Sequence, residues 1–95
     1  MGQDARLFIF AYDVTDDRRR ARVAHLLEQD AARVQDSLFE AMLRPALADQ
    51  LADKVKRLLL PGDRLRVYSV PRHEIDRIVA YGGAPVQQGE DYWLL

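Results

Sequence analysis

The sequence predicts one small α+β domain in which two helices cover a sheet. Strand-like and helix-like segments alternate along 95 residues, a length that suits one domain. Hydrophobic residues make up 48% of the chain, which makes a core possible. A domain of this size buries only roughly 60–65% of the surface of its unfolded chain, so a second copy would add stability. We therefore expect a single domain over residues 1–95, with a C-terminal tail from about residue 82.

Residues 7–14 predict the first strand, and both of its faces are apolar, so both should be covered. One face carries three aromatic side chains, Phe8, Phe10 and Tyr12. A helix is expected to begin at residues 15–17, because any of the three can cap it and two acids suit the helix dipole. This helix should run to about Asp30. Its apolar stripe consists of Ala21, Val23, Leu26 and Leu27.

Residues 33–43 are strand-like but contain no glycine or proline, so they predict either one long bent strand or a hairpin with an irregular turn. Pro45 opens a second helix, where its missing N–H costs nothing, and residues 61–62 end it. The buried stripe of that helix consists of Leu47, Leu51, Val55, Leu58 and Leu59. Residues 63–70 form a strand, residues 74–81 fit a short helix or a strand, and residues 92–95 form a short terminal strand.

The strand over residues 63–70 alternates cleanly, with Leu65 and Val67 pointing inward and Arg64, Arg66 and Tyr68 pointing outward. This order of elements predicts a ferredoxin-like split βαβ sandwich with an extra C-terminal strand. Two helices cover only one face of such a sheet, so we expect the aromatic face of the first strand to be left open. A two-fold homodimer would cover it with a second copy, since a large exposed apolar face is unusual for a monomer. The alternative is that the tail covers this face within its own chain.

Composition excludes several classes of function. The chain has no cysteine, which excludes a disulfide framework, a thiol nucleophile and a cysteine-ligated zinc site. It has no apolar run near 18 residues and a polar start, so we expect a cytoplasmic protein without a membrane partner. Net charge is -1, but 12 of the 14 basic residues are arginine, which pairs bidentately with phosphate. A GC-rich genome is the alternative explanation for the arginines.

Asp13 is the residue that is most informative about chemistry. It closes an apolar strand just before a helix, where a carboxylate costs free energy unless something pairs with it. The candidate partners are a divalent cation such as Mg²⁺ and the arginines that follow; a structural carboxylate that accepts backbone N–H groups is the alternative. One carboxylate holds magnesium weakly, but a two-fold dimer contains two, and one ion between them could orient water at a phosphodiester.

Arginines crowd the first turns of the helix after Asp13, namely Arg18, Arg19, Arg20 and Arg22. Phosphate gains from both the arginines and the helix N-terminus, so this run predicts a nucleic-acid contact; a solvated helix face is the alternative. If the next segment is a strand, one of its sides carries Arg33, Gln35, Ser37 and Phe39. Polar residues on that side suit a site or an interface near a two-fold axis better than a plain core.

Four stretches of the sequence carry a resemblance to a known family. They are Ala11–Val14, Thr15–Arg20, Arg33–Glu40 and Asp63–Tyr68. The third stretch, R-V-Q-D-S-L-F-E, is close to the R-V-Q-x-S-V-F-E pattern of the CRISPR-associated Cas-two proteins. The sequence therefore resembles that family over most of its length, with Asp36 and Leu38 as departures. Asp36 weakens the case that this edge touches phosphate.

The resemblance implies a ferredoxin-like homodimer whose C-terminal strand, residues 92–95, pairs with the sheet of the other subunit. It implies a nuclease dependent on Mg²⁺ or another divalent cation, acting on RNA or double-stranded DNA, with Asp13 as the metal ligand. Other positions that the family associates with activity are matched by Tyr12, Arg20, Arg22, Arg33, Ser37 and Phe39. The biological role implied is spacer acquisition, in which the dimer bridges Cas-one integrase dimers along captured DNA.

Three functions follow as competing hypotheses. The first is a magnesium-dependent phosphodiesterase built on paired copies of Asp13. The second is a scaffold that bridges DNA and whose nuclease site is dispensable. We favour this second hypothesis as the biological role. The third is a toxin-type metal-dependent endoribonuclease of the same fold.

Overall fold

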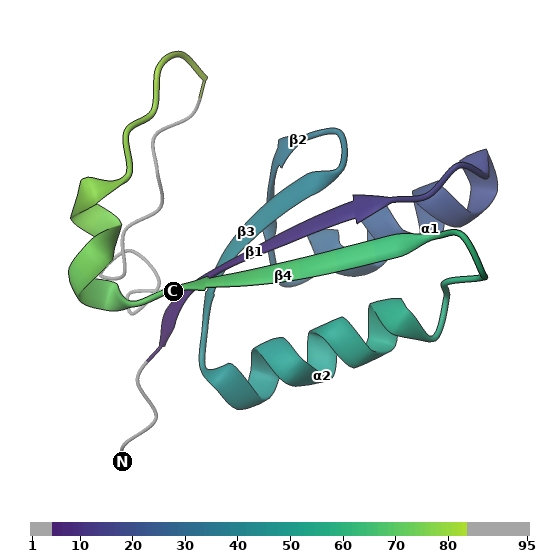
Figure 1. Ribbon diagram of the computed structural model, residues 1–95, viewed down its shortest axis with the longest axis horizontal. Helices are drawn as coiled ribbons and strands as arrows, with labels where there is room; N and C mark the ends of the chain where they lie inside the picture. Colours follow the sequence, from purple (N-terminus) through teal and green to yellow (C-terminus); the bar gives the residue numbers. More distant parts are fainter. Residues whose placement is uncertain (1–4, 84–95) are drawn as a thin grey trace.

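The computed structural model describes residues 5–83, which form a four-stranded antiparallel sheet and two α-helices (Figure 1). The strands lie side by side in the order β2-β3-β1-β4. The elements in chain order are β1 (Arg6–Asp13), α1 (Asp17–Glu28), β2 (Ala32–Gln35), β3 (Leu38–Leu43), α2 (Pro45–Lys56), β4 (Arg64–Val70) and the 3₁₀ helix η1 (Arg72–Arg77). The α+β class and element order predicted from the sequence are confirmed. The terminal strand predicted at residues 92–95 lies outside the described residues.

The core lies between the two helices and the aromatic face of β1. Phe10 is fully buried and Phe8 and Tyr12 are nearly so, in one cluster with Leu27 of α1 and Val55 of α2. The expectation that this aromatic face is left open for a second copy is therefore wrong. Large rings fill the space between sheet and helices, and the smaller side chains of β1 point the other way. Two helices do cover only one face, but it is the face with the rings.

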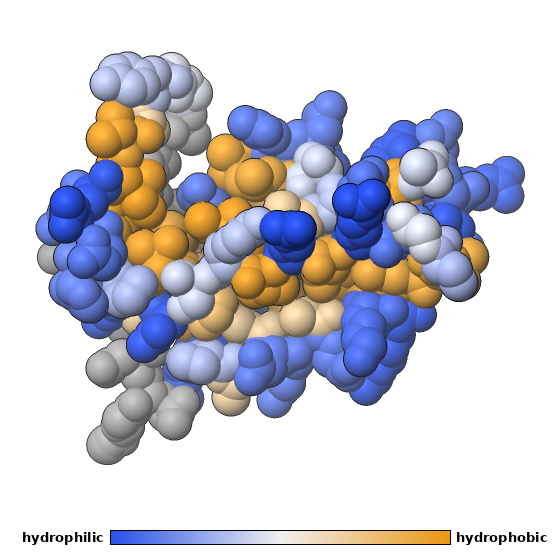
Figure 2. All heavy atoms as spheres, in the orientation of Figure 1, coloured by the Kyte–Doolittle hydropathy of each residue, from blue (hydrophilic) through white to orange (hydrophobic). Residues whose placement is uncertain are grey.

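The opposite face of the sheet is only partly covered by the described residues. Leu7 is buried there against Ile75 of η1, whereas Ile9 and Ala11 are only partly buried. Cross-strand partners share a face, so the register extends this surface from β1 onto β3 and β4. We call it the open face; it consists of Ile9, Ala11, Asp13, Leu38, Glu40, Arg64, Arg66 and Tyr68. In Figure 1 α1 lies behind the strands, and Figure 2 shows apolar side chains gathered along the near side of the sheet, with hydrophilic ones standing among them.

Residues 33–43 form a hairpin rather than one bent strand. β2 and β3 are joined at Asp36 and Ser37, two residue types that support turns by bonding nearby backbone groups. The pairing shifts register between Arg33 and Gln35. The prediction that Ser37 shares one side of a strand with Arg33 is therefore wrong, since Ser37 sits in the turn. Phe39 instead lies directly across from Arg33 on the neighbouring strand.

The helices differ from the sequence expectation in detail. Asp16 caps α1 by accepting a hydrogen bond from the backbone N–H of Arg19 at 2.8 Å, and the helix ends two residues before Asp30. Ala21 and Leu47 are exposed, so their predicted places in the apolar stripes of the two helices are wrong. Ala24 and Ala48 face the core in their helices instead. The ambiguous segment after β4 contains the 3₁₀ helix η1, and within residues 5–83 no helix is long and apolar enough to span a membrane.

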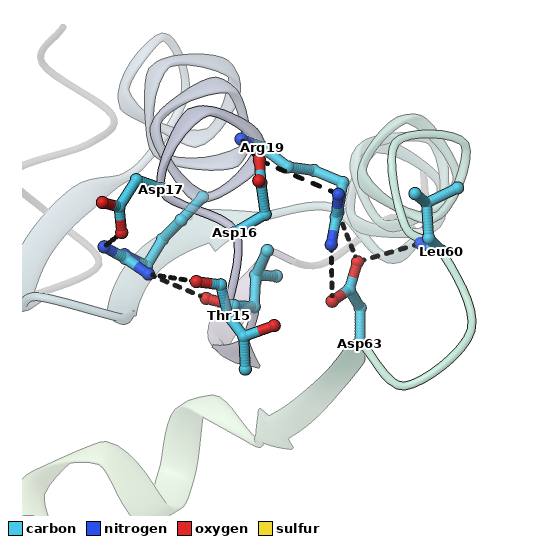
Figure 3. A network of polar contacts seen from close by, with 8 residues as sticks. Thr15, Asp16, Asp17, Arg19, Leu60 and Asp63 are labelled. Carbon is cyan, nitrogen blue, oxygen red and sulfur yellow. Dashed lines mark hydrogen bonds and ion pairs between the residues drawn. The ribbon is translucent and has the colours of Figure 1, made fainter.

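An ion pair ties the start of α1 to the start of β4 (Figure 3). The Nε of Arg19 donates to Oδ2 of Asp63 at 2.6 Å, and Nη2 donates to Oδ1 at 3.2 Å. Asp63 also accepts from the backbone N–H of Leu60 at 2.9 Å, and its side chain is 2% exposed. The hydrogen bond from Arg19 is the main cause that lowers the pKa of Asp63 below its ordinary value of 3.8. This pair fixes how β4 enters the sheet.

Replacing Phe10 with alanine should destabilise the fold by about 3–5 kcal/mol, because a fully buried ring between sheet and helices is lost and leaves a cavity. Urea unfolding followed by circular dichroism measures this change. Leu47→Ala is the matched control on α2, since this side chain is 48% exposed and its loss should change the free energy of unfolding little. Equal effects of the two substitutions would contradict the assignment of the core.

Asp63→Asn should remove stability that depends on pH. Because the folded-state pKa of Asp63 is lowered, its ion pair contributes above about pH 3.8 and the contribution is lost as the pH falls through the folded pKa. The gap in thermal stability between wild type and variant should therefore be widest near neutral pH and close on acidification. Asp53→Asn is the control, since Asp53 pairs with Arg57 on an exposed helix surface. A gap that stays constant with pH would contradict the assignment.

Candidate functional site

Asp13 is the last residue of β1 and stands on the open face. It is exposed, and among residues 5–83 its carboxylate has no hydrogen bond or ion pair. The alternative of a structural carboxylate that accepts backbone N–H groups therefore finds no support in the described part of the chain. Its cross-strand partner is Arg64, the first residue of β4. A free carboxylate and an arginine thus share one end of the open face.

The loop after Asp13 is held by Arg20. Its guanidinium donates to the carbonyl oxygens of Val14 at 3.0 Å and Thr15 at 3.2 Å. It also donates to the carboxylate of Asp17 at 2.5 Å, in the same network as the α1 cap (Figure 3). Arg20 is therefore a positioning residue for the loop that follows Asp13.

The four arginines of α1 do not act as one group. Arg19 is paired with Asp63 and Arg20 is bonded to its own loop, so each guanidinium already has partners within the chain. Arg18 and Arg22 are exposed and form no ion pair with any residue of the described range. The sequence prediction placed all four near Asp13 as phosphate contacts; the structure leaves two of them available for that role.

The other predicted site residues lie on the helix side of the sheet or at its turn. Tyr12 and Phe39 are buried, and their rings stack with centroids 6.2 Å apart. The Tyr12 hydroxyl donates to the carbonyl oxygen of Asp36 at 3.0 Å, and the guanidinium of Arg33 lies 5.3 Å from the centre of the Phe39 ring. The carbonyl oxygen of Ser37 accepts the backbone N–H of Tyr12 at 3.1 Å. These contacts fasten the hairpin to the end of β1.

The predicted site residues are therefore divided by the sheet. Consecutive residues of a strand point to opposite faces, so Tyr12 points into the core and Asp13 to the open face. The rings of Tyr12 and Phe39 pack on the helix side of the sheet, on the face opposite to Asp13. Their catalytic roles, and that of Ser37, stay predictions.

Two arginines of β4 join the open face without having been predicted as site residues. Arg64 pairs in register with Asp13, and Arg66 pairs with Ala11. Arg66 donates to the Tyr68 hydroxyl at 3.2 Å, which is the main cause that raises its pKa. The alternation of residues 63–70 shows that these side chains point outward, but only the register of β1 with β4 places Arg64 beside Asp13.

A divalent cation would find one carboxylate at this end of a single chain. Magnesium prefers several oxygen ligands in an octahedral arrangement and keeps part of its water. Among the residues that the structure describes there is no group of three or more acidic, histidine or cysteine side chains that could hold a metal ion. One chain therefore fits a divalent cation only in part, and further ligands have to come from a second Asp13 or from phosphate.

Comparison with known proteins identifies a family and several relatives of this chain. The family model for CRISPR associated protein Cas2 matches residues 6–78. CRISPR-associated endonuclease Cas2 2 of Thermus thermophilus is 46% identical over 66 residues, which cover 68% of this chain and 73% of the relative. CRISPR-associated endoribonuclease Cas2 2 of Synechocystis sp. is 34% identical over 90 residues, which cover 93% of this chain and 97% of the relative.

A solved structure with a similar fold belongs to the same family as these relatives. A chain in the structure of a partial Cas6-RT-Cas1--Cas2 complex matches with a TM-score of 0.72 at 27% identity, covering 87% of this chain and 92% of that one. The resemblance inferred from the four sequence stretches is confirmed. Since the family model spans most of the chain and a relative more than 30% identical covers nearly all of it, the chain belongs to the Cas2 family of CRISPR-associated proteins.

Proposed function

We propose that this chain forms a two-fold dimer that binds double-stranded DNA and bridges Cas1 integrase dimers in the cytoplasm during spacer acquisition. Family membership and the relative found in a complex with Cas1 support an adaptation role. The observation that carries the proposal is the open face, where residues 5–83 leave Ile9 and Ala11 incompletely covered and give Asp13 no partner at one end. A surface that combines incompletely covered apolar side chains with charged ones suits a copy of the same chain.

The dimer would use the sheet in two ways. The open face would pack against its copy, and the C-terminal strand over residues 92–95 would pair with the sheet of the other subunit. β4 is an edge strand of the described sheet, so its outer backbone groups have no strand partner among residues 5–83. Edges of this kind are normally covered, which supports strand pairing there.

Double-stranded DNA would be held by the arginines that remain available. Arg18 and Arg22 extend from the exposed side of α1, and Arg64 stands beside Asp13. Arginine binds phosphate bidentately, and such contacts position a duplex without reading its sequence. Because the net charge of the chain is -1, we expect modest intrinsic affinity that falls steeply with salt.

Nuclease activity is the second part of the proposal, and RNA is its favoured substrate because several relatives carry endoribonuclease names. Asp13 from each of two chains would hold Mg²⁺ or another divalent cation. That ion would supply charge neutralisation at phosphate and an activated water. In this arrangement Arg64 holds a neighbouring phosphate, and Arg20 keeps the loop behind Asp13 in place.

Two sets of substitutions separate the scaffold from the nuclease. Asp13→Asn keeps the size of the side chain and should lower metal-stimulated cleavage on the order of 100-fold or more, because the charge that holds the ion is lost. The same variant should keep dimerisation, DNA affinity and integration together with Cas1. Cleavage of labelled RNA and an integration assay with purified Cas1 measure the two activities.

The double variant Arg18→Gln, Arg22→Gln should do the opposite. It should weaken DNA binding and integration. It should also reduce the slope of the logarithm of the binding constant against the logarithm of the salt concentration, by about 0.9 for each phosphate that is no longer neutralised. Lys54→Gln on α2 is the matched charge control. Loss of integration in Asp13→Asn would contradict a dispensable nuclease site, and full DNA binding by the double variant would contradict the assigned role of these two arginines.

A further inference from the structure

Asp63 is fixed from several sides just before β4 begins (Figure 3). Its carboxylate accepts hydrogen bonds from Nε and Nη2 of Arg19 at 2.6 and 3.2 Å, and from the backbone N–H of Leu60 at 2.9 Å. Its own backbone N–H donates to the carbonyl oxygen of Leu60 at 2.9 Å, which closes the turn before the strand. The side chain is 2% exposed, and these donors replace the water that a buried carboxylate loses. The residue that precedes Arg64 therefore has a fixed position.

Arg19 also contacts the loop that follows β1. Its backbone N–H donates to Oδ2 of Asp16 at 2.8 Å, and its Nη1 lies 3.8 Å from the same oxygen. Asp16 belongs to the short loop between Asp13 and the first residue of α1. Arg19 therefore connects two loops that are far apart in sequence, the loop that leaves β1 and the loop that enters β4.

Asp13 and Arg64 form the last pair between β1 and β4, at the end of the sheet where these two loops lie. The ends of paired strands open most readily, because no further pair follows them. β4 is also an edge strand of the described sheet, so among residues 5–83 no strand supports Arg64 from the outer side. The contact between Arg19 and Asp63 joins this end of β4 to α1, next to the last pair. It is placed to keep that pair closed.

We propose that Arg19 and Asp63 are positioning residues that hold Arg64 beside Asp13. This inference rests on the proposed nuclease function and adds two residues to its site. Neither residue touches the substrate, because Asp63 is nearly buried and Arg19 belongs to α1, which covers the face opposite to Asp13. A displacement of about 1 Å at a site can cost on the order of 100-fold in rate, so the link between the two loops acts on activity through Arg64.

Amide hydrogen exchange followed by nuclear magnetic resonance tests the link without any substrate. In Asp63→Asn the amides of Asp13 and Arg64 should exchange on the order of 10-fold faster than in wild type, because the end of the strand pair opens more often. The amides of Phe10 and Val67, which pair in the middle of the same two strands, should change less. Unchanged exchange at Asp13 and Arg64 would overturn the proposal.

Cleavage of labelled RNA tests the effect on the site. Asp63→Asn should lower metal-stimulated cleavage about 10-fold or more, at a temperature where circular dichroism shows the variant to be folded. Arg19→Lys keeps the positive charge but loses the two-point contact, so it should have a similar effect and replaces Asp63→Asn if that variant does not fold. Arg57→Gln on α2 removes an exposed ion pair with Asp53 and is the matched control, which should leave cleavage unchanged.

A double-mutant cycle with Arg64→Gln separates positioning from a merely structural role. If Asp63 acts through Arg64, Asp63→Asn should cause little further loss of cleavage once Arg64 has been replaced. Equal losses in the two backgrounds would overturn the proposal. A wild type without metal-stimulated cleavage would contradict the proposed nuclease function instead, and hydrogen exchange would then still decide whether Asp63 holds Arg64 in place. Normal cleavage by both Asp63→Asn and Arg19→Lys would overturn the positioning role and leave the nuclease function intact.

Discussion

The two faces of β1 are the constraint on which the rest of the structure depends. A strand sends consecutive side chains to opposite sides, and here one side carries three aromatic rings that fill the space beneath α1 and α2. That choice leaves the smaller side chains of β1 on the open face and ends this face with Asp13. The position of the acid is therefore set by packing: a strand that buries Tyr12 must turn Asp13 outward.

The surroundings of Asp13 follow from the way the nearby charges are paired. Arg19 is engaged by a nearly buried Asp63, and Arg20 is engaged by the carbonyl groups of the loop itself. Both arginines stabilise the path of the chain around the acid. What remains available at the site comes from elsewhere, chiefly from Arg64, which the register of β4 brings alongside. Two of the four arginines at the start of α1 therefore stabilise the fold, whereas Arg18 and Arg22 are exposed.

Sequence patterns predicted the order of the elements and the place of Asp13 at the end of the first strand, because both depend on local periodicity and capping. They could not tell which face of β1 the helices cover, since both faces are apolar and the decision rests on the volumes that fit beneath two helices. A hairpin over residues 33–43 was one of two alternatives, and its turn at Ser37 could not be located because it contains no glycine or proline. Asp13 and Arg64 are far apart in sequence, so only the register between β1 and β4 shows that they are neighbours.

The central claim is that two open faces meet with the ends of their β1 strands together. The chain has no cysteine, so Thr15→Cys provides a single site for a nitroxide label on the exposed loop just after Asp13. The distance between the two labels in the dimer, measured by pulsed electron spin resonance, tests the claim directly. We predict one distance below the length of β1, which is about 27 Å for a strand of this size. A single population clearly longer than that length would place the two acids at opposite ends and contradict the account.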